Sequence, residues 1–371
     1  MMARFVTKDE IGKLQRFLER SYGHGRGFFL RYHPELQEIA PTSSLVIDAN
    51  GSIAAHVGVY PLKLKVGSST LTCGGIGGVA AAIDHRGQGL MSHLMHEAIR
   101  HMREQGWSMS VLWGDRQRYQ HFGYQTCGIK FNLRINRRSL QRARIEPSTT
   151  VEEVDKTSSD VLRKLEELSA EIDFGVEREQ LELLLSRPSA RVFIGDEGYL
   201  ISMRERSGDL EVTEVISPSG SEAELIYGAL VWSFGDEANV ELAGAQTERA
   251  ARLSRVCNYW RASPQGMFHI ISWPQLLEEL APFLGVQVAG VPAFRMSIGC
   301  RWQETVDQAT IDWDGARLSV SSGRHASEYV ELENPHLTGL LLGGPFCGAE
   351  KLGMFGRLLP VPIHIPIMDH V

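Results

Sequence analysis

The sequence predicts an α+β protein of layered domains built on mixed sheets. Two observations predict this fold class: strand-like and amphipathic helical segments alternate through the first two blocks of the chain, and strand-like segments dominate after Gly290. The 371 residues exceed an ordinary single domain, so two or three domains are expected. Hydrophobic residues make up 43% of the chain and charged residues 22%, which provides ample material for globular cores.

The first block, residues 1–136, begins with a helix and a hairpin. Glu10–Tyr22 is amphipathic, with one apolar face. Ser44–Asp48 and Ile53–Val66 are β-rich and meet at Asn50-Gly51, a strong hairpin signal. Thr70–Ile83 is a further apolar, glycine-rich strand.

The clearest helix of the chain, Leu90–Gln105, follows that strand. Gly106 is placed to end it, and strands are expected at Trp107–Trp113 and Phe131–Ile135. One face of the helix is apolar and consists of Met91, Leu94, Met95, Ala98 and Met102.

The second block, residues 150–288, follows a polar linker, Arg137–Asp155, and has a similar order of elements. Its expected helices are Asp160–Ser169, Arg178–Leu185, Ala223–Phe234 and Trp273–Leu284. Its expected strands are Ala190–Ile194, Tyr199–Arg204, Leu210–Ile216 and Asn239–Leu242, with turns at Glu197-Gly198 and Ser207-Gly208. We therefore interpret this block as a diverged copy of the first.

The third block, residues 291–371, reads as a smaller α+β domain. It has a strand at Phe294–Gly299 and a hairpin around Trp313-Asp314-Gly315. Its tail, residues 358–368, places three prolines among apolar residues, which favours an extended segment docked on the protein.

Composition excludes several classes of protein. The formal net charge of -7 argues against nucleic-acid binding, which needs a basic face. The five cysteines are scattered and contain no Cys-x-x-Cys, so we expect neither a disulfide framework nor a metal site. No export signal or membrane span is recognisable, and we expect a cytoplasmic protein.

The stretch that carries chemistry is residues 79–95, an apolar strand that runs through a glycine-containing turn into a helix. The first turn of a helix exposes unpaired N–H donors at its positive end, which suits a diphosphate. Gly87 and Gly89 allow the backbone to approach a ligand closely, and Arg86 adds charge or braces the turn. The alternative is a plain strand–turn–helix connection.

Competing motifs do not fit. The run Gly74-Gly75-Ile76-Gly77-Gly78 lacks the spacing of a dinucleotide-binding loop, and no Gly-Lys-Ser/Thr follows any glycine loop. The histidines of His96–His101 miss the spacing of a zinc protease by one residue.

At this point the chain resembles a known family. Arg86-Gly87-Gln88-Gly89-Leu90-Met91 is similar to the acetyl-CoA pyrophosphate loop of the GNAT superfamily, Arg/Gln-x-x-Gly-x-Gly/Ala, although Met91 replaces a small residue. That form, with Leu112-Trp113 and Tyr119-Gln120-His121-Phe122-Gly123-Tyr124, resembles the enhanced-intracellular-survival (Eis) type, with one residue fewer between Trp113 and Tyr119. The resemblance implies tandem GNAT folds, the second degenerate, and a C-terminal domain similar to sterol carrier proteins. It also implies a homo-oligomer.

The resemblance implies roles for particular residues. The loop residues Arg86, Gly87, Gln88, Gly89, Leu90 and Met91 would hold the pyrophosphate of acetyl-CoA, and Val79 and Ala81 would lie beside its pantetheine arm. Tyr119 would be the general acid that protonates the departing thiolate, a role that the pKa values of a thiol (~8.5) and a phenol (~10) make reasonable. The alternative for Tyr119 is an aromatic side chain at the core edge.

The same resemblance implies that the carboxylate of Val371 accepts the proton of the amine acceptor. The apolar tail fits docking, whereas a frayed terminus is the alternative. Four other residues remain candidate bases: His56, Asp115, Asp369 and His370.

These observations favour an acetyl-CoA-dependent N-acetyltransferase acting by direct transfer to a primary amine of a small molecule, a lysine or a peptide. The segment Gly25–Tyr32 and the final residues are candidates for the acceptor pocket. In the second block Ser217-Pro218-Ser219-Gly220-Ser221 stands at the junction that would hold a cofactor, so we expect none there. The alternatives are a non-catalytic CoA- or lipid-binding protein and an acyltransferase that uses a longer acyl chain, as in tandem-GNAT N-myristoyltransferases.

Overall fold

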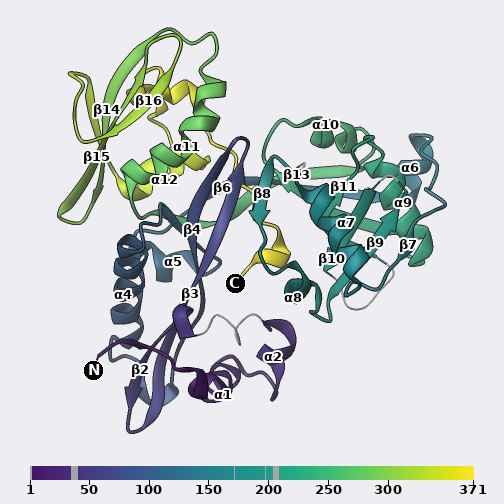
Figure 1. Ribbon diagram of the computed structural model, residues 1–371, viewed down its shortest axis with the longest axis horizontal. Helices are drawn as coiled ribbons and strands as arrows, with labels where there is room; N and C mark the ends of the chain where they lie inside the picture. The colour runs from purple at the N-terminus through teal and green to yellow at the C-terminus, as the bar shows by residue number, and fades with distance from the viewer. Residues whose placement is uncertain (1, 35–40, 171, 197, 204–208) are drawn as a thin grey trace.

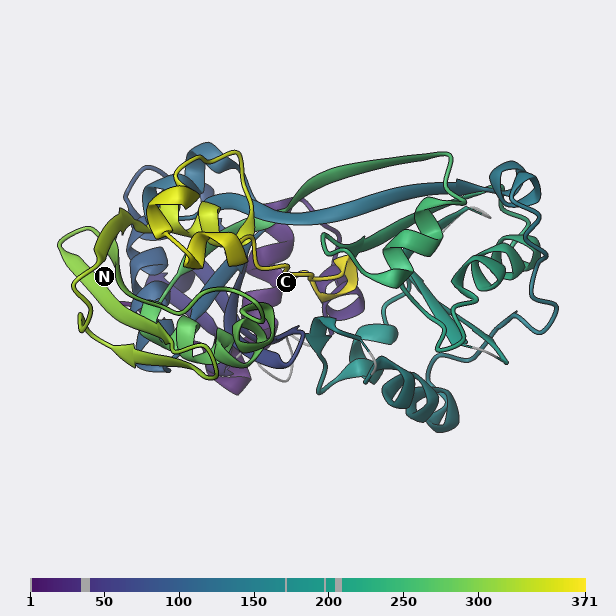
Figure 2. The ribbon, with the colours of Figure 1, turned by 90° about the horizontal axis from the view of Figure 1, so that it is seen from above.

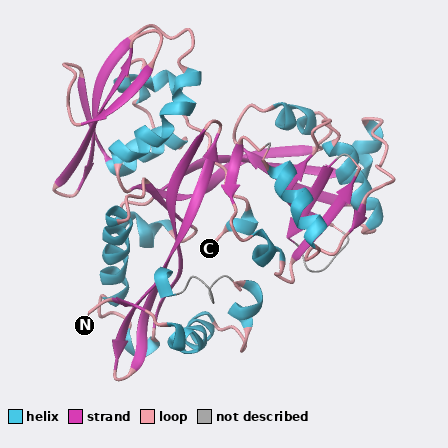
Figure 3. Cartoon of the chain, in the orientation of Figure 1, coloured by secondary structure: helices cyan, strands magenta, loops and turns pink. Residues whose placement is uncertain are grey.

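The computed structural model describes residues 2–34, 41–170, 172–196, 198–203 and 209–371 (Figures 1 and 3). The expected turn at Ser207-Gly208 and the residues Glu197 and Arg204 lie outside these ranges. In the first block the helices are α1 (Ile11–Tyr22), α2 (Phe28–Tyr32), α4 (Leu90–Glu104) and α5 (Arg116–Tyr119). Its strands are β1 (Arg4–Phe5), β2 (Ser44–Ala49), β3 (Ser52–Val66), β4 (Ser69–Ala81), β5 (Met109–Leu112) and β6 (Gln125–Asn136).

The second block repeats the alternation of strand and helix. The helices between Arg137 and Gln287 are α6 (Arg137–Arg142), α7 (Ser159–Ser169), α8 (Leu181–Leu185), α9 (Glu222–Trp232), α10 (Glu248–Ser254) and α11 (Trp273–Gln287). The strands are β7 (Glu152–Glu153), β8 (Phe174–Glu177), β9 (Ala190–Gly195), β10 (Gly198–Met203), β11 (Leu210–Ile216), β12 (Glu237–Ala243) and β13 (Tyr259–Ile270).

The third block forms a separate small sheet with the order β16-β15-β14-β17. Its elements are β14 (Phe294–Trp302), β15 (Thr305–Trp313), β16 (Leu318–Ser322), β17 (Tyr329–Glu333) and α12 (Asn334–Leu342). Helix α11 contacts β15 and β16 of this sheet and also β4 of the first block. The predicted fold class, α+β with a large mixed sheet and a smaller C-terminal sheet, is confirmed.

One sheet runs through the first two blocks. Its order in the described residues is β1-β2-β3-β4-β5-β13-β6-β12-β11-β10-β9-β7, with β8 paired to β3. Strand β13 therefore lies between β5 and β6, and β6 continues into the second block by pairing with β12. Figure 2 shows β6 and β13 as the two long ribbons, blue-green and green, that join the halves of the molecule.

Most expected elements form near the expected positions, and the differences have local causes. Asn50 and Gly51 both take positive φ, as the predicted hairpin turn requires. The linker begins with α6, because the side chain of Asn136 accepts a hydrogen bond from the Ser139 N–H and caps it. Helix α8 begins at Leu181, three residues later than predicted, and Arg178 instead turns its side chain to Glu214 and Asp369.

The C-terminal tail is extended as predicted up to Pro366 and then forms a single 3₁₀ turn, Ile367–Asp369. Ile363 and Ile365 are fully buried, whereas Ile367 is 49% exposed. Ile367 is exposed because the 3₁₀ turn ends the alternation of the extended segment. Along the described part of the chain, no helix combines the length and apolar character needed to cross a bilayer.

Candidate functional site

The site begins where two parallel strands of the first block separate. β4 and β5 pair only from Cys73 with Met109 to Ile76 with Leu112. β4 then continues to Ala81, and among the described residues only β3 pairs with this part of it. Beyond Ile76, the edge of β4 that faced β5 is therefore not paired with β5.

The loop after β4 has the features that an anion site needs. Gly87 and Gly89 have φ values of +76° and +75°, which L side chains rarely adopt. Arg86, Gly87, Gln88 and Gly89 are exposed, and a Cβ atom added to either glycine would meet nothing within 4 Å. Helix α4 has no acidic residue in its first turn, so no side chain of its own competes for the N-terminal N–H groups.

The other predicted cofactor residues lie directly before and after this loop in the sequence. Leu90, the first residue of α4, is buried, and Met91 is half-buried against the core. Val79 and Ala81 lie on β4 just before the loop and are half-buried. The hydroxyl of Tyr22 donates a 2.9 Å hydrogen bond to the carbonyl oxygen of Val79, so that acceptor on the strand edge already has a partner.

Tyr119 is the last residue of α5, and its position depends on its neighbours. Asp115 caps the short helix by accepting a hydrogen bond from the Arg118 N–H. A Cβ atom on Gly114 would lie 2.3 Å from the Tyr119 ring, so only glycine leaves room for that ring. Tyr119 is 7% exposed, and burial raises the pKa of its phenol, against a smaller opposing effect of Arg118. The raised pKa keeps the hydroxyl protonated at neutral pH.

Tyr119 and the last residue of the chain line the same cavity, which has a volume of about 340 Å³. Val371 lines this cavity with Tyr119, although 252 residues separate them in the sequence (371 − 119). Phe28 and Phe29, from the segment expected to line the acceptor pocket, also border it. The remaining lining residues come from α1, the loops around α2, β3, β4 and the end of β5, namely Leu18, Tyr22, His24, His33, Tyr60, Ile76, Gly77, Gly78, Val79, Leu112 and Trp113.

The glycine run in β4 makes room for the chain terminus. A Cβ atom on Gly77 would lie 2.6 Å from the carboxyl carbon of Val371, and one on Gly75 would lie 2.5 Å from its Cγ2 atom. Real Cβ contacts are not this short, so both positions require glycine for the terminus to lie there. The role of this glycine run could not be predicted from the sequence, because the residue that needs the space lies at the other end of the chain.

Polar contacts fix the tail in front of the cavity. The Arg178 guanidinium donates 2.8 Å hydrogen bonds to both carboxylate oxygens of Asp369, and all these groups are buried. Arg187 donates to the carbonyl oxygen of Met368 at 2.8 Å. The His370 ring stacks on Trp113 with 3.7 Å between ring centroids. The last four residues are therefore anchored to both the first and the second block (Figure 1).

These contacts bear on two of the alternative bases. Burial raises the pKa of the Asp369 carboxyl, an effect that Arg178 opposes, and the two-pronged ion pair occupies both oxygens. Burial lowers the pKa of His370 to about 3, so its ring is neutral at pH 7. Neither residue lines the cavity that holds Tyr119.

The other two alternative bases also have structural partners. His56 is fully buried, its Nδ1 atom lies 2.7 Å from the carbonyl oxygen of Gly78, and burial lowers its pKa to about 4. Asp115 is exposed and serves as the cap of α5. The residues that the structure brings together around one cavity are thus Tyr119 and Val371.

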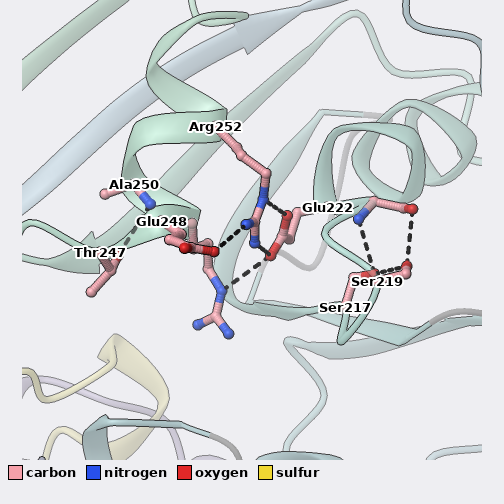
Figure 4. A network of polar contacts seen from close by, with 9 residues as sticks. Ser217, Ser219, Glu222, Thr247, Glu248, Ala250 and Arg252 are labelled. Atoms are coloured by element: carbon pink, nitrogen blue, oxygen red, sulfur yellow. Dashed lines mark hydrogen bonds and ion pairs between the residues drawn. The ribbon is translucent and has the colours of Figure 1, made fainter.

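The second block differs at the junction that corresponds to the loop. Glu222, the first residue of α9, is buried, and its carboxylate accepts hydrogen bonds from the Arg252 guanidinium at 2.7 and 3.0 Å. The Ser217 hydroxyl accepts the backbone N–H of Ser221 (Figure 4). The first turn of α9 thus carries a carboxylate paired with Arg252, and the N–H of Ser221 has a hydroxyl partner, whereas the first turn of α4 has neither an acidic residue nor a side-chain cap. Elsewhere in the described ranges, no group of three or more His, Cys, Asp or Glu side chains could hold a metal ion.

Comparisons with known proteins concern the first block and the overall fold. Residues 2–127 match the family model described as an acetyltransferase (GNAT) domain, so the first block carries such a domain. No curated protein matches the chain. The likeness to solved structures extends over nearly the whole length and, at these low identities, shows the fold alone.

Three of these structures are named here. A probable N-acyltransferase from Enterococcus faecalis is 17% identical, with a TM-score of 0.76 over 98% of both chains. A GCN5-related N-acetyltransferase from Kribbella flavida is 15% identical, with a TM-score of 0.72 over 98% of this chain and 97% of that one. Eis1 from Mycobacterium abscessus is 14% identical, with a TM-score of 0.64 over 96% of this chain and 93% of that one.

Proposed function

We propose that this protein is an acetyl-CoA-dependent N-acetyltransferase that acts on primary amines. The observation that carries the proposal is the cavity lined by both Tyr119 and the C-terminal Val371, on the strand that leads to a glycine loop and a helix start without a side-chain cap. Arg86–Met91 would hold the diphosphate, and β4 would lie along the pantetheine arm. Acetyl-CoA, when bound, supplies the acetyl group as a thioester.

The two residues in the cavity have complementary proton chemistry. A C-terminal carboxylate has a pKa near ~3.5 in water and is ionised at neutral pH, so it can orient an ammonium group and accept its proton. The Tyr119 phenol keeps its proton and can give it to the sulfur atom that leaves. In this proposal the Val371 carboxylate therefore accepts a proton from the acceptor nitrogen, and the Tyr119 phenol supplies a proton to the thiolate.

The acceptor is proposed to approach as a cation. Val371 also lines a second cavity, of about 190 Å³, between β3 and the segment after β8. The carboxylates of Glu177, Glu179 and Asp369 border this cavity. Lys63, Arg178 and Arg187 border the same cavity, and Lys63 pairs with Glu179 and Arg178 with Asp369, so the charged side chains of the wall balance. The attraction for an ammonium group is therefore assigned to the Val371 carboxylate, which supports a small-molecule or lysine amine as acceptor.

A thiol-release assay with acetyl-CoA and a panel of diamines, polyamines, amino sugars and lysine peptides tests the proposal. We expect release of one CoA per acetylated amine, with the product identified by mass spectrometry. If no amine in the panel accelerates thiol release over solvent hydrolysis, while acetyl-CoA binds, the protein is a CoA-binding protein and the proposal fails. Replacing acetyl-CoA by myristoyl-CoA distinguishes an acetyltransferase from an enzyme that uses longer acyl chains.

The oligomer implied by the resemblance also remains a proposal. The end of α9 presents exposed apolar side chains, with Phe234 92% exposed and Trp232 44% exposed. Such residues on a surface are typical of protein–protein contacts. Light scattering on the purified protein should give a multiple of 41.3 kDa, and a monomer would contradict the proposal.

A further inference from the structure

A second cavity of about 430 Å³ lies where β11 and β12 separate in the second block. These strands pair in parallel only from Leu210 with Ala238 to Val212 with Val240. The residues that follow on each strand, Thr213–Val215 and Glu241–Ala243, line the cavity. The first block has its cavity at the corresponding place, where β4 and β5 separate.

Two buried polar groups at this cavity lack hydrogen-bond partners among the described residues. The first is the hydroxyl of Thr213, a residue that is only 2% exposed. The second is the Nε atom of Arg249, which lies 3.5 Å from Glu222 as an ion pair without a hydrogen bond. Leaving a buried polar group unpaired is energetically unfavourable, so such groups usually mark a position that something else satisfies.

The charges around the cavity have both signs. Arg249 and Arg252 contribute guanidinium groups, and Arg252 is paired with Glu222. The carboxylates are those of Glu214 and Glu241 on the strands, with Asp173 and Glu248 also at the border. Glu214 accepts hydrogen bonds from Arg178 and Tyr199, and Glu241 pairs with Lys130, so both carboxylates are held in place. A simple anion would lie among four carboxylates, and a simple cation would leave the Arg249 Nε atom and the Thr213 hydroxyl without a hydrogen-bond partner among the described residues.

The start of α9 excludes one class of ligand, namely a diphosphate. Glu222 and Arg252 close that helix end with their own ion pair, as Figure 4 shows, so a diphosphate has no place there. The ligand must therefore fit within the cavity itself and carry opposite charges on a small frame.

We propose that the cavity between β11 and β12 binds a small zwitterion, namely a free α-amino acid. Its carboxylate binds Arg249 and the Thr213 hydroxyl, and its ammonium group faces Glu214 and Glu241. His364 and Pro366 of the C-terminal tail also line this cavity, so the ligand contacts the segment that carries Val371 to the first block. The proposal is independent of the reaction catalysed there.

Calorimetry on the full chain with each of the twenty L-amino acids tests this site, with acetate, phosphate and ethylamine as singly functional comparators. We expect one or a few amino acids to bind at one per chain, and the three comparators not to bind. Thr213→Val keeps the side-chain shape and removes a hydroxyl that has no protein partner, so the protein should fold and the affinity should fall roughly 10-fold or more. Thr157→Val, a surface threonine of the same block, is the matched control and should bind normally.

A second variant keeps the test valid if Thr213→Val does not fold. Arg249→Gln changes a helix side chain outside the core and should also weaken binding at least roughly 10-fold, as the loss of a charged partner does. Binding that survives both substitutions unchanged would place the ligand elsewhere, for instance in the first block as an acceptor amine. The proposal is also overturned if none of the amino acids binds, or if acetate or phosphate binds as tightly as they do.

Discussion

Single residues decide the proposed chemistry at the first cavity, and Tyr119 is the sharpest case. Tyr119→Phe should retain the affinity for acetyl-CoA and lower kcat by ~10²–10⁴-fold, the range for a lost acid–base group. Tyr124→Phe is the control, because Tyr124 is buried against Ser110 and does not line the cavity. Steady-state kinetics measure both variants. Normal turnover in Tyr119→Phe would remove this hydroxyl from the mechanism.

Gly77 is a residue whose importance lies entirely in what packs against it. A Cβ atom there would come 2.6 Å from the Val371 carboxyl carbon, so Gly77→Ala must displace the terminus. We expect turnover to fall at least ~10-fold with acetyl-CoA affinity retained, because a misplacement of about 1 Å can cost that much. Gly12→Ala in α1, where the new methyl group meets only an arginine side chain at 3.5 Å, should be harmless. Equal rates for both variants would contradict the role given to the terminus.

At this scale the sequence predicted part of the site. The loop and Tyr119 could be located because they lie in one short stretch that resembles a known motif. Gly75 and Gly77 could not be assigned, because their need for space comes from Val371, and no local pattern reports a contact across almost 300 residues (371 − 77). The candidate bases His56 and Asp369 are titratable residues whose burial and partners only the fold reveals.

At the scale of the elements, substitutions at the two ends of helix α4 test whether the loop before it binds the cofactor. Gly89→Val should abolish acetyl-CoA binding measured by calorimetry, because valine obstructs the exposed loop and strains a backbone with φ of +75°. Gly106→Val is a matched control at the other end of the same helix. Gly106 has φ of +71° and equally open surroundings, so the strain is the same and the loop is untouched. Loss of binding in both variants would mean that strain, and not the loop, is responsible.

Several elements are not predicted from the sequence, among them β8, α10, β17, α12 and the long strand β13, and β13 has the clearest reason. Pro264 and Gly266 interrupt its apolar pattern, and a proline usually argues against a central strand. The structure resolves this conflict, because β5 pairs only with Met267–Ile270, so Pro264 has a strand neighbour, β6, on one side alone. Local signals found α4 and the β2–β3 hairpin for the opposite reason, since their periodicity and turn residues act within a few positions.

Over the whole molecule, buried histidines predict sensitivity to acid. Burial lowers the pKa values of His56 and His269 to about 4 and those of His364 and His370 to about 3. The unfolded chain binds these protons near pH ~6.5, so each histidine lowers the free energy of unfolding by up to ~1.4 kcal/mol per pH unit as pH falls below that value. The free energy of unfolding stops falling only when the pH is below the pKa values of these histidines in the folded protein.

Thermal unfolding measured from pH 8 to pH 4.5 checks this expectation. The midpoint should change little above pH 7 and fall steeply below pH 6, and His269→Gln should have a shallower slope. A midpoint that stays constant between pH 6.5 and pH 5 would show that these rings are not held neutral.

The tail links all three blocks, which gives a test of the terminal carboxylate itself. Appending Gly-Ser after Val371 moves the charge and removes no buried side chain. Turnover should fall by ~10²-fold or more, while acetyl-CoA affinity and the melting temperature should hold. The same two residues added before Met1 are the control. An extended protein that acetylates its amine at the normal rate would leave the carboxylate without a catalytic role.

The contact between Val371 and β4 also has a consequence for how the protein is made. A ribosome synthesises the chain from its N-terminus, so the glycine loop and Tyr119 emerge early, and domains can begin to fold as they appear. Val371 and the residues that anchor its segment, Arg178 and Asp369, follow much later in the chain. The cavity that holds Tyr119 therefore gains its Val371 wall late in folding, after the second block has supplied the arginine that holds the tail.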